Sequence, residues 1–401
     1  MRNVYLDNNA TTPLLPEVFE AMRPYFFESF GNASSLYERG QRARTAVESA
    51  RHAVASLLGA DASEIIFNSG GSEGDNHAIL GLVSPGDHVI TSVIEHHSVL
   101  AACKRLEATG SSVTYIPVDS RGQVNPEDVR AALRPNTRLI SVMMANNETG
   151  VVQPLEEIGH IAADADVWFH TDAVQAAGKL PVDVNRIKCD LLSISGHKFH
   201  APQGTGALYV RRGTPIHSLI LGGAQEHNRR AGTENLPGIV GLGKAAELAS
   251  KWLADGGPER MAAMRDEFER TISEQLECIQ IQGLWVPRTP NTSHISFTGI
   301  SGASLMVALD GRDISVSTGS ACASGSDEPP YVLMAMGLKR DQAQASVRFS
   351  LGKQTFKEEM DYVQTYLIAE VTKLRRLSPV WNSRRKKKSY SAPARELIAQ
   401  A

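Results

Sequence analysis

The amino-acid sequence predicts an α/β protein with a large, mostly parallel sheet and a smaller α+β part. From about residue 16 to about residue 255, short apolar runs typical of strands alternate with stretches whose apolar residues recur at helical spacing. This alternation favours a parallel sheet covered by helices. Beyond the turn-forming segment Gly256-Gly257-Pro258, the pattern changes to two long amphipathic helices with short strand-like runs between them.

One amphipathic helix is expected over residues 43–57, where apolar side chains recur three and four positions apart. Another is expected from Leu155, because Pro154 precedes it and acidic residues occupy its first turn. Strand-like apolar runs occur at residues 65–67, 88–93, 139–144, 167–170, 191–195 and 206–210. The carboxyl ends of parallel strands meet at one edge of a sheet, so we expect ligand-binding side chains just after these runs.

In the smaller part, apolar stripes over residues 261–276 and 356–374 predict two helices. Strand-like runs occur there at residues 293–297, 314–317 and 346–350. The predicted domains are residues 16–257 for the large one, and residues 1–15 plus 258–380 for the small one. Residues 381–401 include the basic run Arg384-Arg385-Lys386-Lys387-Lys388 and are expected to form a solvated, disordered tail.

The composition excludes several classes of function. Hydrophobic residues make up 42% and charged residues 21% of the 401 residues, which is typical of a soluble globular protein. The net charge of −3 indicates no basic surface for nucleic acid, and no apolar run is long enough to span a bilayer. The first residues lead into a strand-like segment without the apolar stretch of a signal peptide. We therefore expect a cytoplasmic protein that binds neither nucleic acid nor membrane.

The four cysteines contain no Cys-x-x-Cys pair and do not form a disulfide framework. Cys103, Cys189 and Cys278 have apolar neighbours and are expected to pack as small core residues. Cys322 differs, because residues 317–326 around it are all small. This composition predicts a loop on which the thiol is exposed and able to move. Cys322 is therefore the candidate reactive thiol.

The candidate catalytic lysine is Lys198, which ends the segment Ser193-Ile194-Ser195-Gly196-His197-Lys198 after an apolar strand. A lysine at this place must be paired, shifted in pKa or bonded covalently, and a desolvated lysine forms imines readily. On this segment alone, a lysine whose stem is buried and whose ammonium reaches water is an equally good interpretation.

Two further segments favour the covalent interpretation. Asn68-Ser69-Gly70-Gly71-Ser72-Glu73 joins a strand to a helix that begins near Ser72, and its small residues would let backbone N–H groups approach an anion. Asp172 and Gln175 follow another apolar strand. A phosphate cradle, a carboxylate and a lysine at neighbouring strand ends are the groups that pyridoxal phosphate requires, since the carboxylate keeps its ring nitrogen protonated.

Nearly the whole chain, from residue 5 to about residue 376, resembles the cysteine desulfurase family, the NifS/IscS type of pyridoxal-phosphate fold type I. The resemblance rests on segments that occur in one order: residues 5–13, Glu95-His96-His97, Asn146-Asn147-Glu148-Thr149-Gly150, and residues 170–175, 195–198, 229–235, 319–324 and 346–350. The departures are mild. Gly71-Ser72 replaces a commoner Ala-Thr pair, Tyr37 stands where histidine is frequent, and Gln203 stands where lysine is frequent.

The resemblance implies a role for each matching residue. Lys198 would bind the cofactor covalently and afterwards move the Cα proton of the substrate. Asp172 would pair with the ring nitrogen, and His96 would stack on the ring. Further cofactor contacts would come from Gly71, Ser72, Ser195 and His197 at the phosphate, and from Asn147 and Gln175 at the phenolic oxygen.

The resemblance also implies the substrate and the partners. Arg348 would bind the carboxylate of L-cysteine through its planar guanidinium, and Asn147 would also lie near the substrate. Cys322 would take sulfur from L-cysteine, giving L-alanine and a persulfide that passes to an acceptor or scaffold protein for iron–sulfur cluster assembly. Thr233 would reach the phosphate in a neighbouring subunit, which implies a homodimer with shared active sites. The acceptor itself, and a transient role of Cys322 as an iron–sulfur ligand, stay open.

Other interpretations are weaker. A selenocysteine lyase or a small-amino-acid aminotransferase of the same fold would also use Lys198 and Asp172, but the aminotransferase would not need Cys322. The segment from Gly238 to Ala245 nearly matches a nucleotide-binding loop, yet Ala245 lacks the hydroxyl that Mg²⁺ requires. One exposed cysteine offers too few ligands for an iron–sulfur scaffold. His97 and His200 are expected to be ordinary buried histidines.

Overall fold

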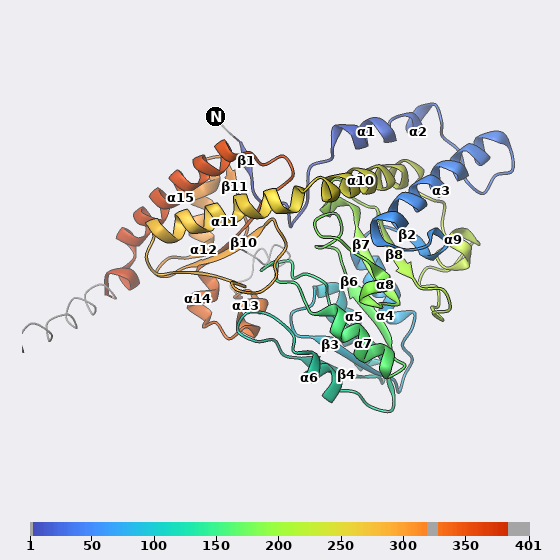
Figure 1. Cartoon of the computed structure of the whole chain (residues 1–401), viewed down its shortest axis with the longest axis horizontal. Coiled ribbons are helices and arrows are strands. Elements are labelled where there is room, and N and C mark those ends of the chain that lie inside the picture. Colours follow the sequence, from blue (N-terminus) through green and yellow to red (C-terminus); the bar gives the residue numbers. More distant parts are fainter. Residues whose placement is uncertain (1–2, 319–327, 384–401) are drawn as a thin grey trace, which may run out of the picture.

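The computed structural model describes residues 3–318 and 328–383, which form two bodies lying side by side (Figure 1). The larger body contains a seven-stranded sheet with strand order β2-β8-β7-β6-β5-β3-β4. Its strands are β2 (Ile65–Asn68), β3 (His88–Ser92), β4 (Ser112–Ile116), β5 (Thr137–Ser141), β6 (Trp168–Asp172), β7 (Leu191–Ser195) and β8 (Gly206–Val210). β8 runs antiparallel to both of its neighbours, and the other pairs are parallel. The predicted α/β fold with a mostly parallel sheet is confirmed.

Helices cover both faces of the large sheet, because successive side chains of its strands belong to different cores. Ile66 and Val89 pack with α4 (Gly71–Leu80) and α5 (His97–Ala108). Their neighbours Ile65 and Ile90 pack with α3 (Glu38–Leu58), α7 (Leu155–Asp164) and α10 (Leu236–Ala254). A strand that is apolar on both sides is the pattern expected in a buried parallel sheet. The same body contains α1 (Pro16–Met22), α2 (Pro24–Phe27), α6 (Pro126–Ala131), α8 (Val184–Ile187) and α9 (Gln225–Asn228).

The smaller body contains an antiparallel sheet of β9 (Ile279–Ile281), β10 (Thr292–Phe297) and β12 (Ser346–Ser350), in the order β12-β10-β9. Its helices are α11 (Gly257–Gln275), α12 (Gly302–Asp310) and α15 (Lys357–Leu377). They share a core with the sheet that includes Phe268, Phe297 and Phe349. β1 (Val4–Tyr5) pairs in parallel with β11 (Ile314–Ser315), so the chain starts in the smaller body and then crosses to α1.

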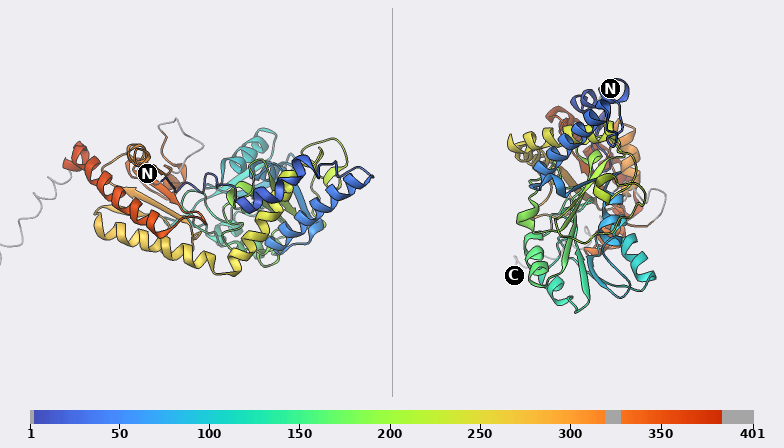
Figure 2. Two further views of the ribbon diagram at one scale, coloured as in Figure 1. Left: turned by 90° about the horizontal axis from the view of Figure 1, so that it is seen from above. Right: turned by 90° about the vertical axis from the view of Figure 1, so that its right-hand side faces the viewer.

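Several connections hold the bodies together, among them a pair of consecutive helices and an apolar cluster. α10 leads into α11 through Gly256, whose φ of 73° favours glycine, and the two helices run along both bodies (Figure 2). On the other side, α13 (Tyr331–Ala335) and α14 (Arg340–Gln344) share an apolar cluster with Ile94 and Met143, which follow β3 and β5. The residue boundaries of two independent domains stay a prediction.

The structure differs from the sequence expectations at several places. β4 was missed because it alternates polar and apolar residues at the edge of the sheet. Cys103 and Cys189 are buried as expected, but Cys278 is only half-buried. His200 is buried, whereas His97 is exposed on the first turn of α5. Trp381, assigned to the tail, is 7% exposed and lies under the Arg375 guanidinium.

Cys322, the other residues from 319 to 327 and the basic run after residue 383 lie outside the described residues. No helix within the described ranges is long and apolar enough to cross a membrane.

Candidate active site

A cavity of about 340 Å³ opens at the carboxyl ends of the parallel strands of the large sheet. The segments that follow β2, β3, β5, β6 and β7 all contribute to its wall, because these strands point in the same direction. The N-terminal segment adds Asn9 and Ala10, and the smaller body adds Tyr331 and Arg348. Of the predicted site residues, the cavity brings together Gly71, Ser72, His96, Asn147, Asp172, Gln175, Ser195, His197, Lys198 and Arg348.

Lys198 ends the 3₁₀ turn η2 (Gly196–Lys198), which follows β7 directly. Its Nζ donates hydrogen bonds to the carbonyl oxygens of Asn9 and Ala10, each 2.7 Å away. The N-terminal segment therefore holds the amine at the cavity instead of letting it extend to bulk water. This position agrees with the predicted covalent attachment of a cofactor.

Asp172, the last residue of β6, is the carboxylate predicted to pair with a ring nitrogen. Its Oδ1 accepts the backbone N–H of Val174 at 2.8 Å, and the residue is 5% exposed. Burial raises the pKa of Asp172, while the nearby His96 and Lys198 act to lower it. A cation bound beside it, such as a protonated pyridine nitrogen, would compensate for the cost of burying this carboxylate.

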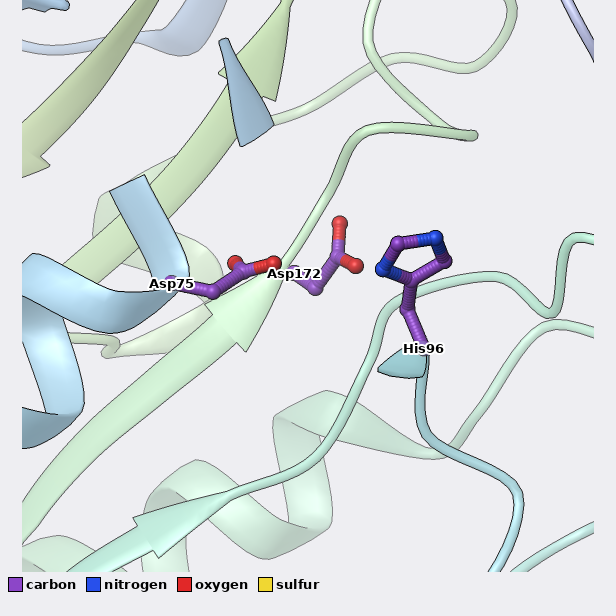
Figure 3. A group of neighbouring side chains, drawn as sticks. All are labelled: Asp75, His96 and Asp172. Atoms are coloured by element: carbon purple, nitrogen blue, oxygen red, sulfur yellow. The ribbon is translucent and has the colours of Figure 1, made fainter. Parts of the chain in front are cut away.

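His96 and Asp75 lie on either side of Asp172, and the three side chains point toward one another (Figure 3). One ligand-type atom from each lies within 4.8 Å of the others, a spacing that a metal ion also requires. Asp75 and His96 are already joined through the hydroxyl of Ser98, at 2.6 Å from each. We therefore assign this cluster to the cofactor ring and not to a metal.

The first turn of α4 forms a cradle for an anion. Gly71 and Ser72 line the cavity at the helix N-terminus, where backbone N–H groups have no acceptor within the helix. A Cβ on Gly71 would lie 2.6 Å from Val174 Cγ2, so glycine lets the first turn of α4 and Val174 approach each other closely. Ser195 also lines the cavity, and its Oγ lies 3.3 Å from the place of a Cβ on Gly70.

His197 and Gln175 are held by neighbours outside the sheet. His197 Nδ1 lies 3.0 Å from Thr11 Oγ1, and burial lowers the pKa of the ring to about 4, helped by the charges of Lys198 and Lys179. Gln175 Oε1 accepts a hydrogen bond from Lys179 Nζ at 2.6 Å, and its Nε2 donates to the Asn9 carbonyl at 3.0 Å. These bonds fix the orientation of the Gln175 amide.

Arg348, on β12, brings the smaller body to the cavity. Its Nη1 donates to the Asn147 carbonyl at 2.9 Å and its Nη2 donates to Asp7 Oδ1 at 2.7 Å, while the residue is only 2% exposed. The Oδ1 of Asn147 is buried and has no hydrogen-bond partner among the described residues. Such a group is costly unless a ligand satisfies it.

Of the remaining predicted site residues, Thr233 is placed outside this cavity and Cys322 is not described. Thr233 is exposed after α9 and does not line it. Cys322 lies outside the described residues, but the preceding Ser317 forms a bridge with Arg348, in which backbone N–H groups are 2.6 and 3.2 Å from the opposite carbonyls. The chain therefore leaves the described structure beside the arginine of the site.

Sequence analysis did not identify Asp75, Lys179, Asn9 or Tyr331 as site residues. Asp75 carries a helical signal, because it lies three positions after Ser72 on α4. Lys179 lies in a turn after β6 and carries no such signal. Asn9 and Tyr331 come from other parts of the chain and carry no local signal.

The cavity fits pyridoxal phosphate. The α4 N-terminus suits its phosphate, and Asp172 suits its ring nitrogen. Lys198 offers the amine for its aldehyde, and the unsatisfied Oδ1 of Asn147 awaits a donor from a ligand.

Comparisons with known proteins agree with a site for pyridoxal phosphate. The family model described as aminotransferase class-V matches residues 4–363. The chain is 49% identical over 382 residues to a cysteine desulfurase IscS of Dictyoglomus turgidum, covering 94% of this chain and 97% of that protein. It is 48% identical over 381 residues to one of Methanosarcina thermophila, covering 94% of each.

Solved structures show the same similarity. A NifS-like protein superposes with a TM-score of 0.87 and 37% identity over 93% of this chain and all of the other. The structure titled "SspA in complex with cysteine" superposes with a TM-score of 0.78 and 38% identity, over 88% of this chain and all of the other.

Proposed function

The chain belongs to the aminotransferase class-V family and, within it, to the cysteine desulfurases, and we propose how its own residues perform that reaction. The proposal rests on one observation: Lys198, Asp172 and the N-terminus of α4 line the same cavity. When bound there, pyridoxal phosphate supplies an electron-accepting ring that weakens bonds at the α- and β-carbons of the substrate.

In this proposal, the large sheet binds and orients the cofactor. The N–H groups of Gly71 and Ser72 hold the phosphate, and Asp172 keeps the ring nitrogen protonated. Lys198 carries the cofactor between turnovers. When L-cysteine is bound in the cavity, Lys198 Nζ accepts the substrate Cα proton.

The smaller body positions the substrate. Arg348 already binds Asp7 and the Asn147 carbonyl, so its guanidinium is oriented before L-cysteine arrives. We propose that it receives the substrate carboxylate, since a planar guanidinium pairs with a carboxylate through two parallel hydrogen bonds. Ser317 leads the chain from this arginine toward Cys322.

Cys322 then accepts the sulfur atom. Its thiolate attacks the sulfur of L-cysteine, so an S–S bond forms while the Cβ–S bond breaks, and the carbon takes a proton to become L-alanine. L-cysteine and the Cys322 thiol thus give L-alanine and a Cys322 persulfide, with no other oxidant or reductant. The buried thiols are poor substitutes, because burial raises the pKa of Cys103 to about 12 and also raises that of Cys189.

The wider biological setting is part of the proposal. We infer a homodimer in which exposed Thr233 reaches the phosphate site of the other subunit, and an acceptor or scaffold protein that takes the persulfide sulfur for iron–sulfur cluster assembly. The relatives named IscS support this use of the sulfur. A cytoplasmic location is in keeping with the free thiols of Cys103, Cys189 and Cys278.

A thiol substitution tests the proposal. Cys322→Ser is expected to bind the cofactor and L-cysteine, but to release no sulfide in the presence of dithiothreitol and to form no L-alanine beyond background. Cys278→Ser is the matched control, since this half-buried thiol does not line the cavity and its removal is expected to preserve turnover. Full sulfide release by Cys322→Ser would exclude the proposed sulfur acceptor.

A further inference from the structure

A short chain of polar side chains links Asp75, which lines the cavity, to His96 through Ser98. Ser98 Oγ lies 2.6 Å from His96 Nδ1 and 2.6 Å from Asp75 Oδ2. Asp75, on α4, is 1% exposed, and Ser98, on the first turn of α5, is 8% exposed. The reaction proposed above gives neither residue a role.

The number of available hydrogens restricts this arrangement. The backbone N–H of Ser98 already donates to His96 Nδ1 at 3.2 Å, so Nδ1 presents its lone pair and carries no proton. The Ser98 hydroxyl has one hydrogen for two acceptor-type neighbours. If it were given to Asp75, two lone pairs would face each other across the short distance between Ser98 Oγ and Nδ1. If it is given to Nδ1, Asp75 must itself donate to Ser98 Oγ.

The surroundings of Asp75 favour the second arrangement. The titratable groups that face it are the carboxyls of Asp172 and Glu95 and the rings of His96 and His170. The His170 ring is neutral, because burial lowers its pKa to about 3, and its Nε2 is 3.6 Å from Asp75 Oδ1. Burial and the charge of Asp172 raise the pKa of Asp75 well above its usual range. Hydrogen bonding with the Ser98 and Ser193 side chains acts to lower this pKa, but burial and the charge of Asp172 outweigh it. Oδ1 has no hydrogen-bond partner of good geometry among the described residues.

We propose that Asp75 is a protonated positioning residue: it donates to Ser98, Ser98 donates to His96 Nδ1, and His96 is thereby fixed as the neutral Nε2–H tautomer. The other ring nitrogen then carries the proton and points away from the two carboxylates (Figure 3). His96 would thus contact the cofactor ring as a neutral side chain of fixed orientation, with Nε2–H as its donor. The effect of this arrangement on catalysis rests on the proposed function, whereas the tautomer of His96 does not depend on that function.

Three variants test this hydrogen-bonded chain from Asp75 through Ser98 to His96, here called the relay, in the holoenzyme. Asp75→Asn keeps a donor toward Ser98 without a titratable proton, while Asp75→Leu removes the donor and Ser98→Ala removes the relay. In protein labelled with ¹⁵N-histidine, the signal of His96 is identified by its loss in His96→Gln and reports the tautomer. We expect the Nε2–H form in the original chain and in Asp75→Asn. Asp75→Leu and Ser98→Ala keep only the longer backbone hydrogen bond, at 3.2 Å, as a fixed donor to Nδ1, and should therefore show a larger share of the Nδ1–H form.

Kinetics give the second measurement. Asp75→Leu and Ser98→Ala are expected to lower kcat/KM for L-cysteine by roughly tenfold, as expected for one lost hydrogen bond, and Asp75→Asn much less. An infrared carboxylic-acid C=O band present in the original chain at neutral pH and missing in Asp75→Asn would show the protonated acid directly.

The relay is overturned if His96 is found as the Nδ1–H tautomer or as imidazolium, or if Asp75→Asn is as damaging as Asp75→Leu. If Asp75→Leu does not fold, Ser98→Ala still decides, because it leaves the carboxyl in place. The tautomer measurement does not depend on sulfur chemistry, so failure of the relay and failure of the desulfurase proposal are distinguishable.

Discussion

The two halves of the cavity are built in different ways. The cofactor half uses Gly71, Asp172 and Lys198, which follow neighbouring strands of one sheet. The substrate half joins Arg348 to Asp7, 341 positions away, and to Asn147, 201 positions away. The first half is built on the large sheet, with the N-terminal segment holding the Lys198 amine, whereas the second exists only when the smaller body also packs against that sheet. Substitutions in the first should therefore abolish chemistry, and those in the second should weaken substrate binding.

The largest effect is expected at Lys198. Lys198→Ala removes the amine that carries the cofactor and accepts the Cα proton, so L-alanine formation should fall by roughly a thousandfold or more. Borohydride reduction of the original chain should leave the cofactor on the peptide that contains Lys198. Lys251→Ala, an exposed lysine on α10, is the control and should retain activity. Cofactor fixed to another lysine would break the account of the cofactor half.

The next largest effect is expected at Asp172. Asp172→Asn replaces a charge with a neutral amide of the same shape, so the ring nitrogen is no longer held protonated. We expect kcat to fall by roughly a hundredfold while the cofactor stays bound, the order typical for removing one electrostatic partner of a reacting group. Asp164→Asn, on the exposed end of α7, serves as the control. A change in KM alone would place Asp172 in the substrate half.

The same contrast shows what the sequence could predict. Gly71, Asp172 and Lys198 were found because each directly follows an apolar strand, and parallel strands must end at one edge of the sheet. The pairing of Arg348 with Asp7 and the contact of Lys198 with the Asn9 and Ala10 carbonyls were not found, because they arise from packing between distant segments.

The structure also buries ionisable side chains that no local sequence pattern predicted to be buried. Lys179 is 7% exposed, and burial lowers its pKa well below the usual range, yet its sequence neighbours resemble an ordinary turn. Asp75 lies on a helix whose other residues gave no reason to expect a buried acid. The resemblance to a family supplied the role of Cys322, which the described structure does not address.

A smaller effect is expected in the substrate half. Arg348→Lys keeps the positive charge but loses the planar pair of donors, so KM for L-cysteine should rise by roughly tenfold, with kcat changed less. Steady-state kinetics measure the two constants separately, and Arg376→Lys, on an exposed position of α15, is the control. If kcat falls and KM does not change, Arg348 does not bind the substrate carboxylate.

The smallest effect concerns stability and pH. Glu95 follows β3, is fully buried, and accepts hydrogen bonds from Ser92 Oγ at 2.5 Å and from the Met143 N–H at 3.0 Å. Burial raises its pKa from 4.5 to about 8. Because the folded protein holds this proton more tightly than the unfolded chain, its stabilisation is complete below pH 4.5 and is lost as the pH rises through about 8.

Glu95→Gln should therefore flatten the decline in the free energy of unfolding between pH 5 and 8, by ~1–3 kcal/mol, as measured by urea unfolding. Glu247→Gln, an exposed glutamate on α10, should show the same decline as the original chain. A decline as steep in Glu95→Gln as in the control would mean that Glu95 is ionised in the folded protein.

We propose that the cavity passes the sulfur of L-cysteine to one thiol, that of Cys322. This proposal is tested most directly by treating the holoenzyme with L-cysteine in the absence of reductant and mapping its peptides by mass spectrometry. The account predicts one added sulfur atom on the peptide that contains Cys322, none on those containing Cys103, Cys189 or Cys278, and one L-alanine formed per persulfide. Alanine formed with the added sulfur on another cysteine, or with none on the protein, would contradict it.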